Sequence, residues 1–301
     1  MKRIVSVSLG SSGRDHRAEI ELLGEKFIVE RIGTNGDLKG AIALIASLDG
    51  KVDAFGLGGI DRYLVAGGKR FEIRDAARLA RTAVRTPVVD GSGLKNTLER
   101  RVVNFLEKGL GMSLRDKRVL MVSGVDRFGM AEAFDQSGAR MVFGDLIFAL
   151  GIPVPITSLK GLQRVAHLAL PALTQMPFTF IYPTGSKQEN NTVNQKYTKH
   201  YEAAEIIAGD FLYIKKYMPE NMAGKVIVTN TVTQADLAEI KKRGAALLVT
   251  STPELQGRSF GTNVIEALLV AVSGKTPVEL GERDYLKLLD QLNFEPRVVA
   301  F

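Results

Sequence analysis

The strongest constraint on the fold is a regular alternation of strand-like and helix-like segments between residues 113 and 274. Short segments rich in β-branched and apolar residues recur there, separated by helical or long crossover segments. Neighbouring parallel strands require such crossovers, because the chain must return to the same end of the sheet before the next strand begins. The alternation therefore predicts a doubly wound, Rossmann-like parallel sheet. Its six expected strands cover residues 119–123, 140–143, 178–182, 206–208, 226–229 and 247–250.

The residues before this region predict a mixed α/β domain of their own, over residues 1–112. Apolar residues alternate in 4–9, and Gly24-Glu25 separates two further alternating segments, which indicates a β-hairpin beside the first strand. The glycine-rich segment 109–113 and the charged cluster after it mark the domain boundary. Further strands are expected at 52–57, 69–73 and 88–89, and helices at 38–48, 75–84 and 94–106.

Three regions follow from this division. We expect an N-terminal α/β domain that carries substrate and catalytic groups, and a dinucleotide-binding domain over 113–274. The last helix of the second domain is expected to begin at Asn263, with Glu266 in the capping-box position. A C-terminal tail over 275–301, with a helix of its own, is expected to pack on the body of the protein.

The amino-acid composition excludes several kinds of site. The chain has no cysteine, which rules out disulfides, thiolate metal ligands and cysteine nucleophiles. Its three histidines do not form an HExxH pair, so we expect no metal site. The N-terminus shows no signal-peptide pattern, and no apolar stretch is long enough to span a bilayer. We therefore expect a cytoplasmic protein without membrane contact.

The formal net charge of +7 comes from Lys and Arg spread along the whole chain. Nucleic-acid surfaces usually concentrate basic residues beside aromatic ones, so we expect no nucleic-acid partner. A small anionic ligand and a solvated basic surface without any partner both fit this distribution. The oligomeric state is open, and a homo-oligomer is compatible with the sequence.

A glycine-containing loop follows the first strand of the second region. It matches the dinucleotide-binding GxGxxG pattern at Gly124 and Gly129, but Asp126 stands where the second glycine belongs. That glycine normally allows the backbone to approach a pyrophosphate. We expect Arg127 to turn toward the phosphate and Asp126 to cap the helix that begins near Phe128.

An acidic residue lies at the distance that a nicotinamide cofactor requires. Asp145 follows the next strand, about twenty residues after Gly124, where a carboxylate binds the ribose hydroxyls of NAD. Its charge would repel the 2′-phosphate of NADP, so NAD is the expected cofactor and NADP the alternative, which Arg140 or Lys187 could favour. A second interpretation is structural, with Asp145 capping the next helix and Gly124 in an ordinary turn.

Polar residues also follow other expected strands. The carboxyl ends of parallel strands meet at one edge of a sheet, where a ligand crevice forms. We therefore expect Thr184, Gly185, Gly209 and Asn230 to join the cofactor site. Each residue alone is more often part of a helix N-cap or a turn.

The segment Asp90-Gly91-Ser92-Gly93-Leu94 follows a short strand and opens a helix before the second domain. It resembles the Asn-Thr-Asp-Gly segment of the quinate and shikimate dehydrogenases. The resemblance implies that Asp90 and a lysine share the proton of the hydroxyl being oxidised. The Asn-Val-Thr-x-Pro segment that precedes the lysine in that family is not found here, and Lys69 and Lys95 are the candidates nearest in sequence. The resemblance to these dehydrogenases further implies that Ser11 and Ser12 hold a substrate carboxylate.

The leading functional hypothesis is therefore an NAD(P)-dependent oxidoreductase. It would oxidise the hydroxyl of a small carboxylated polyol, similar to quinate or shikimate, by hydride transfer. The alternative is a non-catalytic Rossmann-like protein that binds a nucleotide or metabolite, which the aspartate in the glycine loop favours. A nucleotide-sugar transferase is a third hypothesis, which the hairpin in the N-terminal half disfavours.

Overall fold

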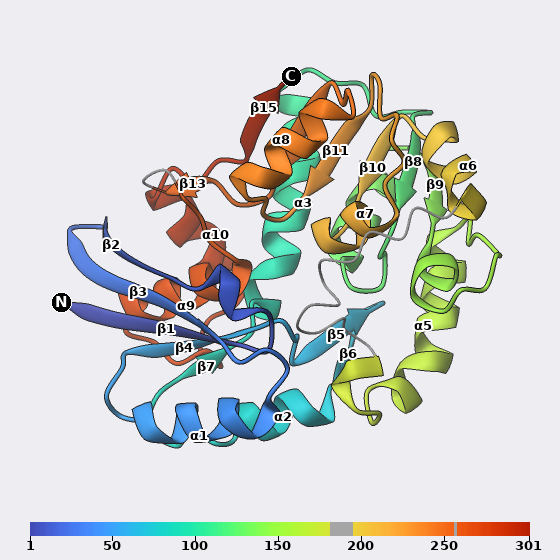
Figure 1. Cartoon of the computed structure of the whole chain (residues 1–301). Coiled ribbons are helices and arrows are strands. Elements are labelled where there is room, and N and C mark those ends of the chain that lie inside the picture. Colours follow the sequence, from blue (N-terminus) through green and yellow to red (C-terminus); the bar gives the residue numbers. More distant parts are fainter. Residues whose placement is uncertain (181–194, 256–257) are drawn as a thin grey trace.

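The chain forms two α/β units, each built on its own largely parallel sheet (Figure 1). The computed structural model describes residues 1–180, 195–255 and 258–301. The mixed α/β class expected from the sequence is confirmed. Within the described ranges, every helix is too short or too polar to cross a lipid bilayer.

The first sheet has the strand order β2-β3-β1-β4-β7. Strand β1 pairs in parallel with β3 and β4, and only β2 runs antiparallel. Both faces are covered, since Ile4 and Val5 point to opposite sides and are both fully buried. The expected hairpin is present, with Leu23 and Gly24 both at positive φ in its turn. The strands are β1 (Lys2–Ser8), β2 (His16–Leu22), β3 (Glu25–Gly33), β4 (Ala54–Gly58) and β7 (Val88–Val89).

The second sheet has the order β15-β12-β11-β10-β8-β9. All its strands are parallel except β15, which pairs antiparallel with β12 at the edge. One expected strand is wrong: Phe178–Phe180 forms a single 3-10 turn, and the rest of that segment lies outside the described residues. The strands are β8 (Arg118–Met121), β9 (Arg140–Phe143), β10 (Ile206–Ala208), β11 (Val226–Thr229), β12 (Leu247–Thr250) and β15 (Arg297–Ala300).

Helices cover both sheets, and two small hairpins lie outside them. The helices are α1 (Leu38–Leu48), α2 (Arg74–Ala80), α3 (Ser92–Lys108), α4 (Phe128–Gln136), α5 (Leu159–Leu173), α6 (Gln195–Ala203), α7 (Phe211–Tyr217), α8 (Gln234–Lys242), α9 (Thr262–Ser273) and α10 (Glu282–Gln291). The hairpins are β5 (Tyr63–Ala66) with β6 (Lys69–Glu72), and β13 (Glu254–Leu255) with β14 (Arg258–Ser259). Short helical turns cover Ser12–Arg14 and Asp145–Ala149.

The C-terminal part of the chain contributes to both units. Helix α9 lies inside the range 113–274, yet it packs on the first sheet, where Val264 and Leu268 share a core with Ile4 and Ala54. The chain then returns through α10 to β15 in the second sheet (Figure 1). Helix α9 is apolar on nearly all sides, which predicts that it is buried. The spacing of its apolar residues does not predict which of the two sheets it packs against.

Glu266 on α9 does not cap its own helix, contrary to expectation. Its Oε2 accepts the Gly91 N–H at 2.6 Å, and its Oε1 accepts the Tyr285 hydroxyl at 2.9 Å. The carboxylate thus binds the N-terminal end of α3, the helix that links the two units. The helix dipole favours an acceptor at that place.

Candidate functional site in the interdomain cleft

The carboxyl ends of both sheets open on one cleft of about 630 Å³. Its walls are the loops that follow β1, β4 and β7 on one side, and β8, β10 and β11 on the other. Ligand crevices form at this end of parallel strands because the loops there are free to carry polar groups. Here the loops of two sheets carry polar groups into the same cleft.

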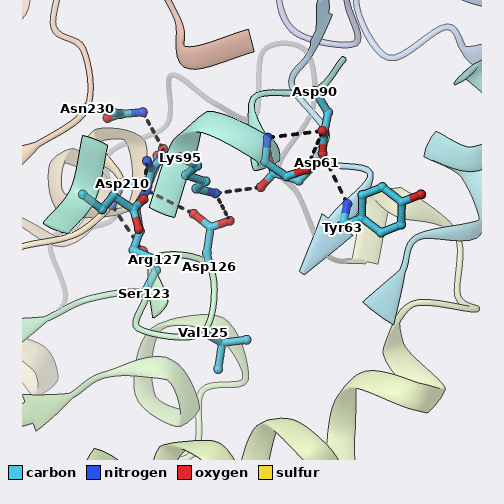
Figure 2. Close-up of polar contacts among 12 residues, drawn as sticks. Asp61, Tyr63, Asp90, Lys95, Ser123, Val125, Asp126, Arg127, Asp210 and Asn230 are labelled. Atoms are coloured by element: carbon cyan, nitrogen blue, oxygen red, sulfur yellow. Dashed lines mark hydrogen bonds and ion pairs between the residues drawn. The ribbon is translucent and has the colours of Figure 1, made fainter. Parts of the chain in front are cut away.

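Lys95 joins the two units at the wall of this cleft. It lies in the first turn of α3 and is 8% exposed. Its Nζ lies 3.0 Å from Asp61 Oδ2 and 2.8 Å from Asp126 Oδ1 (Figure 2). Asp61 follows β4 of the first sheet, and Asp126 follows β8 of the second. One ammonium group therefore binds carboxyl groups that come from different domains.

The three groups titrate very differently because they share one buried site. Burial raises the pKa of Asp61 to about 8, and Lys95 only partly offsets this effect. Burial acts on Asp126 in the same direction, but Lys95 and Arg127 outweigh it and hold its pKa well below the usual range. Burial lowers the pKa of Lys95, yet the two carboxylates more than reverse that change. At neutral pH, Asp61 is the protonated partner of an ionised Asp126, with which it shares a hydrogen bond.

A second ionic cluster surrounds Arg127. Its Nη1 lies 3.0 Å from Glu99 Oε1, its Nη2 lies 2.9 Å from Asp210 Oδ2, and its Nε lies 3.3 Å from Asp126 Oδ2. Asn230 also donates to Asp210, at 2.9 Å (Figure 2). Three carboxylates of the chain itself thus surround the guanidinium that the sequence predicts to turn toward a phosphate.

The Asp145 carboxylate binds the backbone of the glycine loop. The N–H groups of Gly124 and Val125 donate to the two Asp145 carboxylate oxygens, at 3.1 and 2.8 Å. Burial raises the pKa of Asp145 to about 6, and these N–H bonds limit the rise. A Cβ on Gly124 would lie 2.8 Å from the Phe143 ring, so the close approach requires glycine. Neither Gly124 nor Asp145 is among the residues that line the cleft.

The remaining loop residues do not open toward a dinucleotide either. The Asp126 side chain bonds Lys95, and α4 begins after Arg127 without a side-chain cap, so Asp126 is not the expected cap. Phe128 is buried, and Gly129 packs against the Asn96 backbone of α3. The loop residues therefore do not fit a pyrophosphate, since their charged groups and two of their N–H groups already have partners within the chain.

Asp90 lies at the cleft but bonds its own surroundings. Its carboxylate accepts the N–H groups of Arg62 at 2.5 Å and Tyr63 at 3.3 Å. It also accepts the Ser92 hydroxyl at 2.7 Å. Lys95 pairs with Asp61 and Asp126 instead of Asp90. The expected Asp90–lysine pair is therefore not formed.

The other expected residues are dispersed. Lys69 is exposed on β6 and does not line the cleft. Ser11 lines it, whereas Ser12 is exposed and bonds Asn35. Asn230 lines the cleft, but Gly209 lies beneath it, against Val122. The expected cofactor residues Thr184 and Gly185 lie outside the described residues.

Two groups of the site were missed at the sequence level. Asp61 follows Gly58-Gly59 at the end of a buried strand, which is the position where polar ligand groups are expected. Arg31 lies in β3 and donates to Ser8 Oγ at 2.9 Å and to Asp15 Oδ1 at 2.6 Å. The signal for Asp61 is present in the sequence, but a single arginine in a hairpin strand gives none.

Comparisons with known proteins give family matches without a described function. The model of the domain of unknown function DUF8754 matches residues 93–301, and that of DUF8753 matches residues 3–90. The division between them falls at the start of α3, not at the glycine-rich segment after it. No curated protein matches the sequence.

Solved structures resemble the chain only distantly. A glutamate dehydrogenase from Thermus thermophilus has 12% identity and a TM-score of 0.42, over 97% of this chain and 74% of its own. A solute-binding protein of an ABC transporter from Burkholderia multivorans has 11% identity and a TM-score of 0.41, over 99% of both chains. L-Tryptophan dehydrogenase from Nostoc punctiforme has 12% identity and a TM-score of 0.39, over 97% and 78%. These likenesses identify neither a substrate nor an activity.

Proposed function

Since the chain belongs to the DUF8754 family, whose domain has no known function, we propose a function from the geometry of its own cleft. The protein binds a small, hydroxylated, anionic metabolite between its two sheets. The observation that carries this proposal is the convergence of both sets of strand ends on a single cleft of about 630 Å³. This volume lies within the range of ordinary metabolite sites.

Charge on the wall from the first sheet supports an anionic ligand. Arg31 and Arg14 both line the cleft, and the pKa of Arg31 is lowered first by burial and then by the charge of Arg14. Arg31 is held by Ser8 and Asp15. Arg14 is exposed and has no side-chain partner among the described residues. A carboxylate or phosphate would relieve this repulsion and bind the free guanidinium.

The opposite wall supports a ligand with hydroxyl groups. Asp210, Asn230 and Thr231 line it, at the ends of β10 and β11. Their carboxylate, amide and hydroxyl groups can both donate to and accept from a polyol. Asp61 and Asp126 lie at the same cleft and add one protonated and one ionised carboxyl group.

Binding is tested by the melting temperature of the full chain with a panel of hydroxy acids, sugar phosphates and dinucleotides. A ligand present at 100 times its Kd raises the free energy of unfolding by about 2.7 kcal/mol. Arg14→Ala should weaken binding of the active ligand, whereas Arg283→Ala, an equal charge change on α10, should not. If no anionic hydroxylated compound in the panel raises the melting temperature, the proposal fails.

Oxidoreduction is the second candidate, and the Asp61–Lys95–Asp126 cluster favours it. A protonated carboxyl beside an ionised one can take up and release the proton of a ligand hydroxyl. The glycine loop does not fit a dinucleotide, so no hydride step is derived. The test follows the absorbance of reduced nicotinamide with quinate, shikimate and related hydroxy acids, each with NAD or NADP. Turnover that Asp61→Asn abolishes would establish this function; binding without turnover would leave the first.

A further inference from the structure

A second cavity, of about 490 Å³, lies outside the interdomain cleft. It is bounded by β6, by α2 and by the C-terminal end of α5, three elements that lie together in the fold (Figure 1). Arg74, Arg78 and Arg81 are spaced four and three residues apart along α2 and its C-cap, which places them on one face. Arg70 on β6 adds a fourth guanidinium to the same groove.

Little negative charge balances these arginines. Among the described residues that line the groove, Glu72 is the one carboxylate, and it is shared between Arg62 at 2.8 Å and Arg81 at 3.3 Å. The Arg78 guanidinium has no hydrogen-bond or ion-pair partner within the described part of the chain, although the Arg78 carbonyl accepts the Thr82 hydroxyl at 3.0 Å. The Arg70 guanidinium lies over the face of the Tyr63 ring, 5.6 Å from its centroid, and has no carboxylate partner among the described residues.

Arg74 has only a weak internal partner. Its Nε lies 3.4 Å from Asp75 Oδ1, and the other oxygen of Asp75 accepts the Phe178 N–H at 3.0 Å. The Asp75 carboxylate is buried beneath the helix, whereas half of the Arg74 side chain is exposed. In the part of the chain that the structure describes, the groove therefore presents four cations and one shared carboxylate.

The walls of the groove are fixed before any ligand arrives. The Arg74 N–H donates to Thr174 O at 3.0 Å, which joins α2 to the end of α5. His167 Nε2 lies 3.0 Å from Ala66 O, and its ring contacts that of Phe71, so the β5–β6 hairpin is fixed on α5 as well. A preformed site loses little conformational entropy when it binds a ligand.

We propose that this groove binds the phosphate chain of a small polyphosphate, such as a nucleoside di- or triphosphate. The guanidinium fork matches two oxygens of a phosphate group, and charge-assisted bonds of this kind are strong. Arg74 and Arg81 are about 10 Å apart along the helix axis, a span that suits linked phosphates better than a single one. The volume accommodates one nucleotide-sized ligand.

The test measures binding of inorganic triphosphate, pyrophosphate, ATP and a short oligouridylate to the full chain by calorimetry at physiological salt, without added metal. Triphosphate and ATP are expected to bind at one site. R78E and R74E should each weaken this binding at least about tenfold. Both side chains are exposed, and thermal melts of the variants verify that they fold. R283E makes the same charge change on distant α10 and should retain full affinity.

Several outcomes overturn the proposal. Absence of triphosphate binding, or binding that R78E and R74E leave unchanged, excludes the groove as the site. Equal weakening by R283E means non-specific attraction to a basic protein. Tighter binding of oligouridylate than of triphosphate indicates a nucleic-acid surface, and binding of ATP without triphosphate indicates recognition of the base. None of the groove arginines lines the interdomain cleft, so the result is independent of the function proposed for that cleft.

Discussion

Lys95 Nζ lies 2.8 Å from Asp126 Oδ1, and this contact ties the first turn of α3 to the loop after β8. Asp61 approaches the same ammonium from the first sheet. The cluster therefore forms only when the two units are in the arrangement seen here, and its charges are the most sensitive probes of that arrangement.

Replacing Lys95 by methionine should strongly destabilise the protein. The substitution keeps the length of the side chain but leaves Asp61 and Asp126 buried without their shared cation. Breaking a buried ion pair from one side costs about 3 kcal/mol or more. Lys117→Met removes a lysine from an exposed pair with Glu205 and should cost less than about 1 kcal/mol. Urea denaturation of both variants measures the difference, and equal losses would contradict a buried role for Lys95.

Asp61→Asn should change how stability depends on pH. An unfolded aspartate ionises near pH 4, whereas burial raises the pKa of Asp61 to about 8 in the folded chain. Between these values the folded state holds a proton that the unfolded state has lost. The stability that Asp61 contributes is therefore greatest below pH 4, falls as pH rises through this window, and is constant above about pH 8.

The measurement compares the free energy of unfolding of wild type and Asp61→Asn from pH 4.5 to 8. Relative to the variant, wild type should lose on the order of 4 kcal/mol across this range, at about 1.4 kcal/mol per pH unit. Burial raises the pKa of Glu266 to about 8 as well, but Glu266 titrates in both proteins and cancels from the difference. Asp116→Asn, in an exposed pair with Arg140, should show no such slope. Parallel pH curves for wild type and Asp61→Asn would refute a protonated Asp61.

Asp90→Asn should lower stability, because the Asp90 carboxylate holds two loops. One oxygen accepts the N–H groups of Arg62 and Tyr63, and the other accepts the Ser92 N–H and hydroxyl. Asparagine keeps one acceptor oxygen, but its NH₂ group then faces the two donors that bound the other oxygen. We expect this to lower the free energy of unfolding by about 1–3 kcal/mol. Asp135→Asn, on the exposed side of α4, should change the free energy of unfolding by less than about 0.5 kcal/mol. An unchanged melting temperature for Asp90→Asn would show that these bonds do not contribute.

Asp145→Ala distinguishes a structural role from cofactor binding. Without the carboxylate, the N–H groups of Gly124 and Val125 lose their acceptor, which should lower the free energy of unfolding by about 1–3 kcal/mol in the absence of any ligand. Asp145→Asn keeps one acceptor oxygen, so its free energy of unfolding should lie between those of wild type and Asp145→Ala. If Asp145 instead binds a ribose, ligand-free stability should stay the same and the affinity for NAD should fall. Thermal melts with and without NAD separate these outcomes.

Much of the local structure could be predicted from the sequence. Apolar residues at 119–123 and 226–229 are spaced as buried strands require. Strand β11 matches its expected range, and β8 begins one residue and ends two residues before the bounds expected for it. The alternation after residue 113 also predicted the parallel direction of these strands, because a crossover joins each to the next. The expected strand at 178–182 was wrong because Phe178, an apolar β-former, is buried in a single turn at the end of α5 instead.

Tertiary structure alone decided the partners of the charged groups. Lys95 and Asp126 were both predicted as site residues, but for different roles, and only the packing of α3 against α4 brings them into contact. Asp145 has the spacing of a ribose-binding acid, and the same spacing lets it reach back to Gly124. Glu266 binds the N–H of Gly91, 175 residues earlier in the chain. Periodicity and spacing report only on neighbours along one element, whereas a buried charge takes its partner from whichever elements are folded against it.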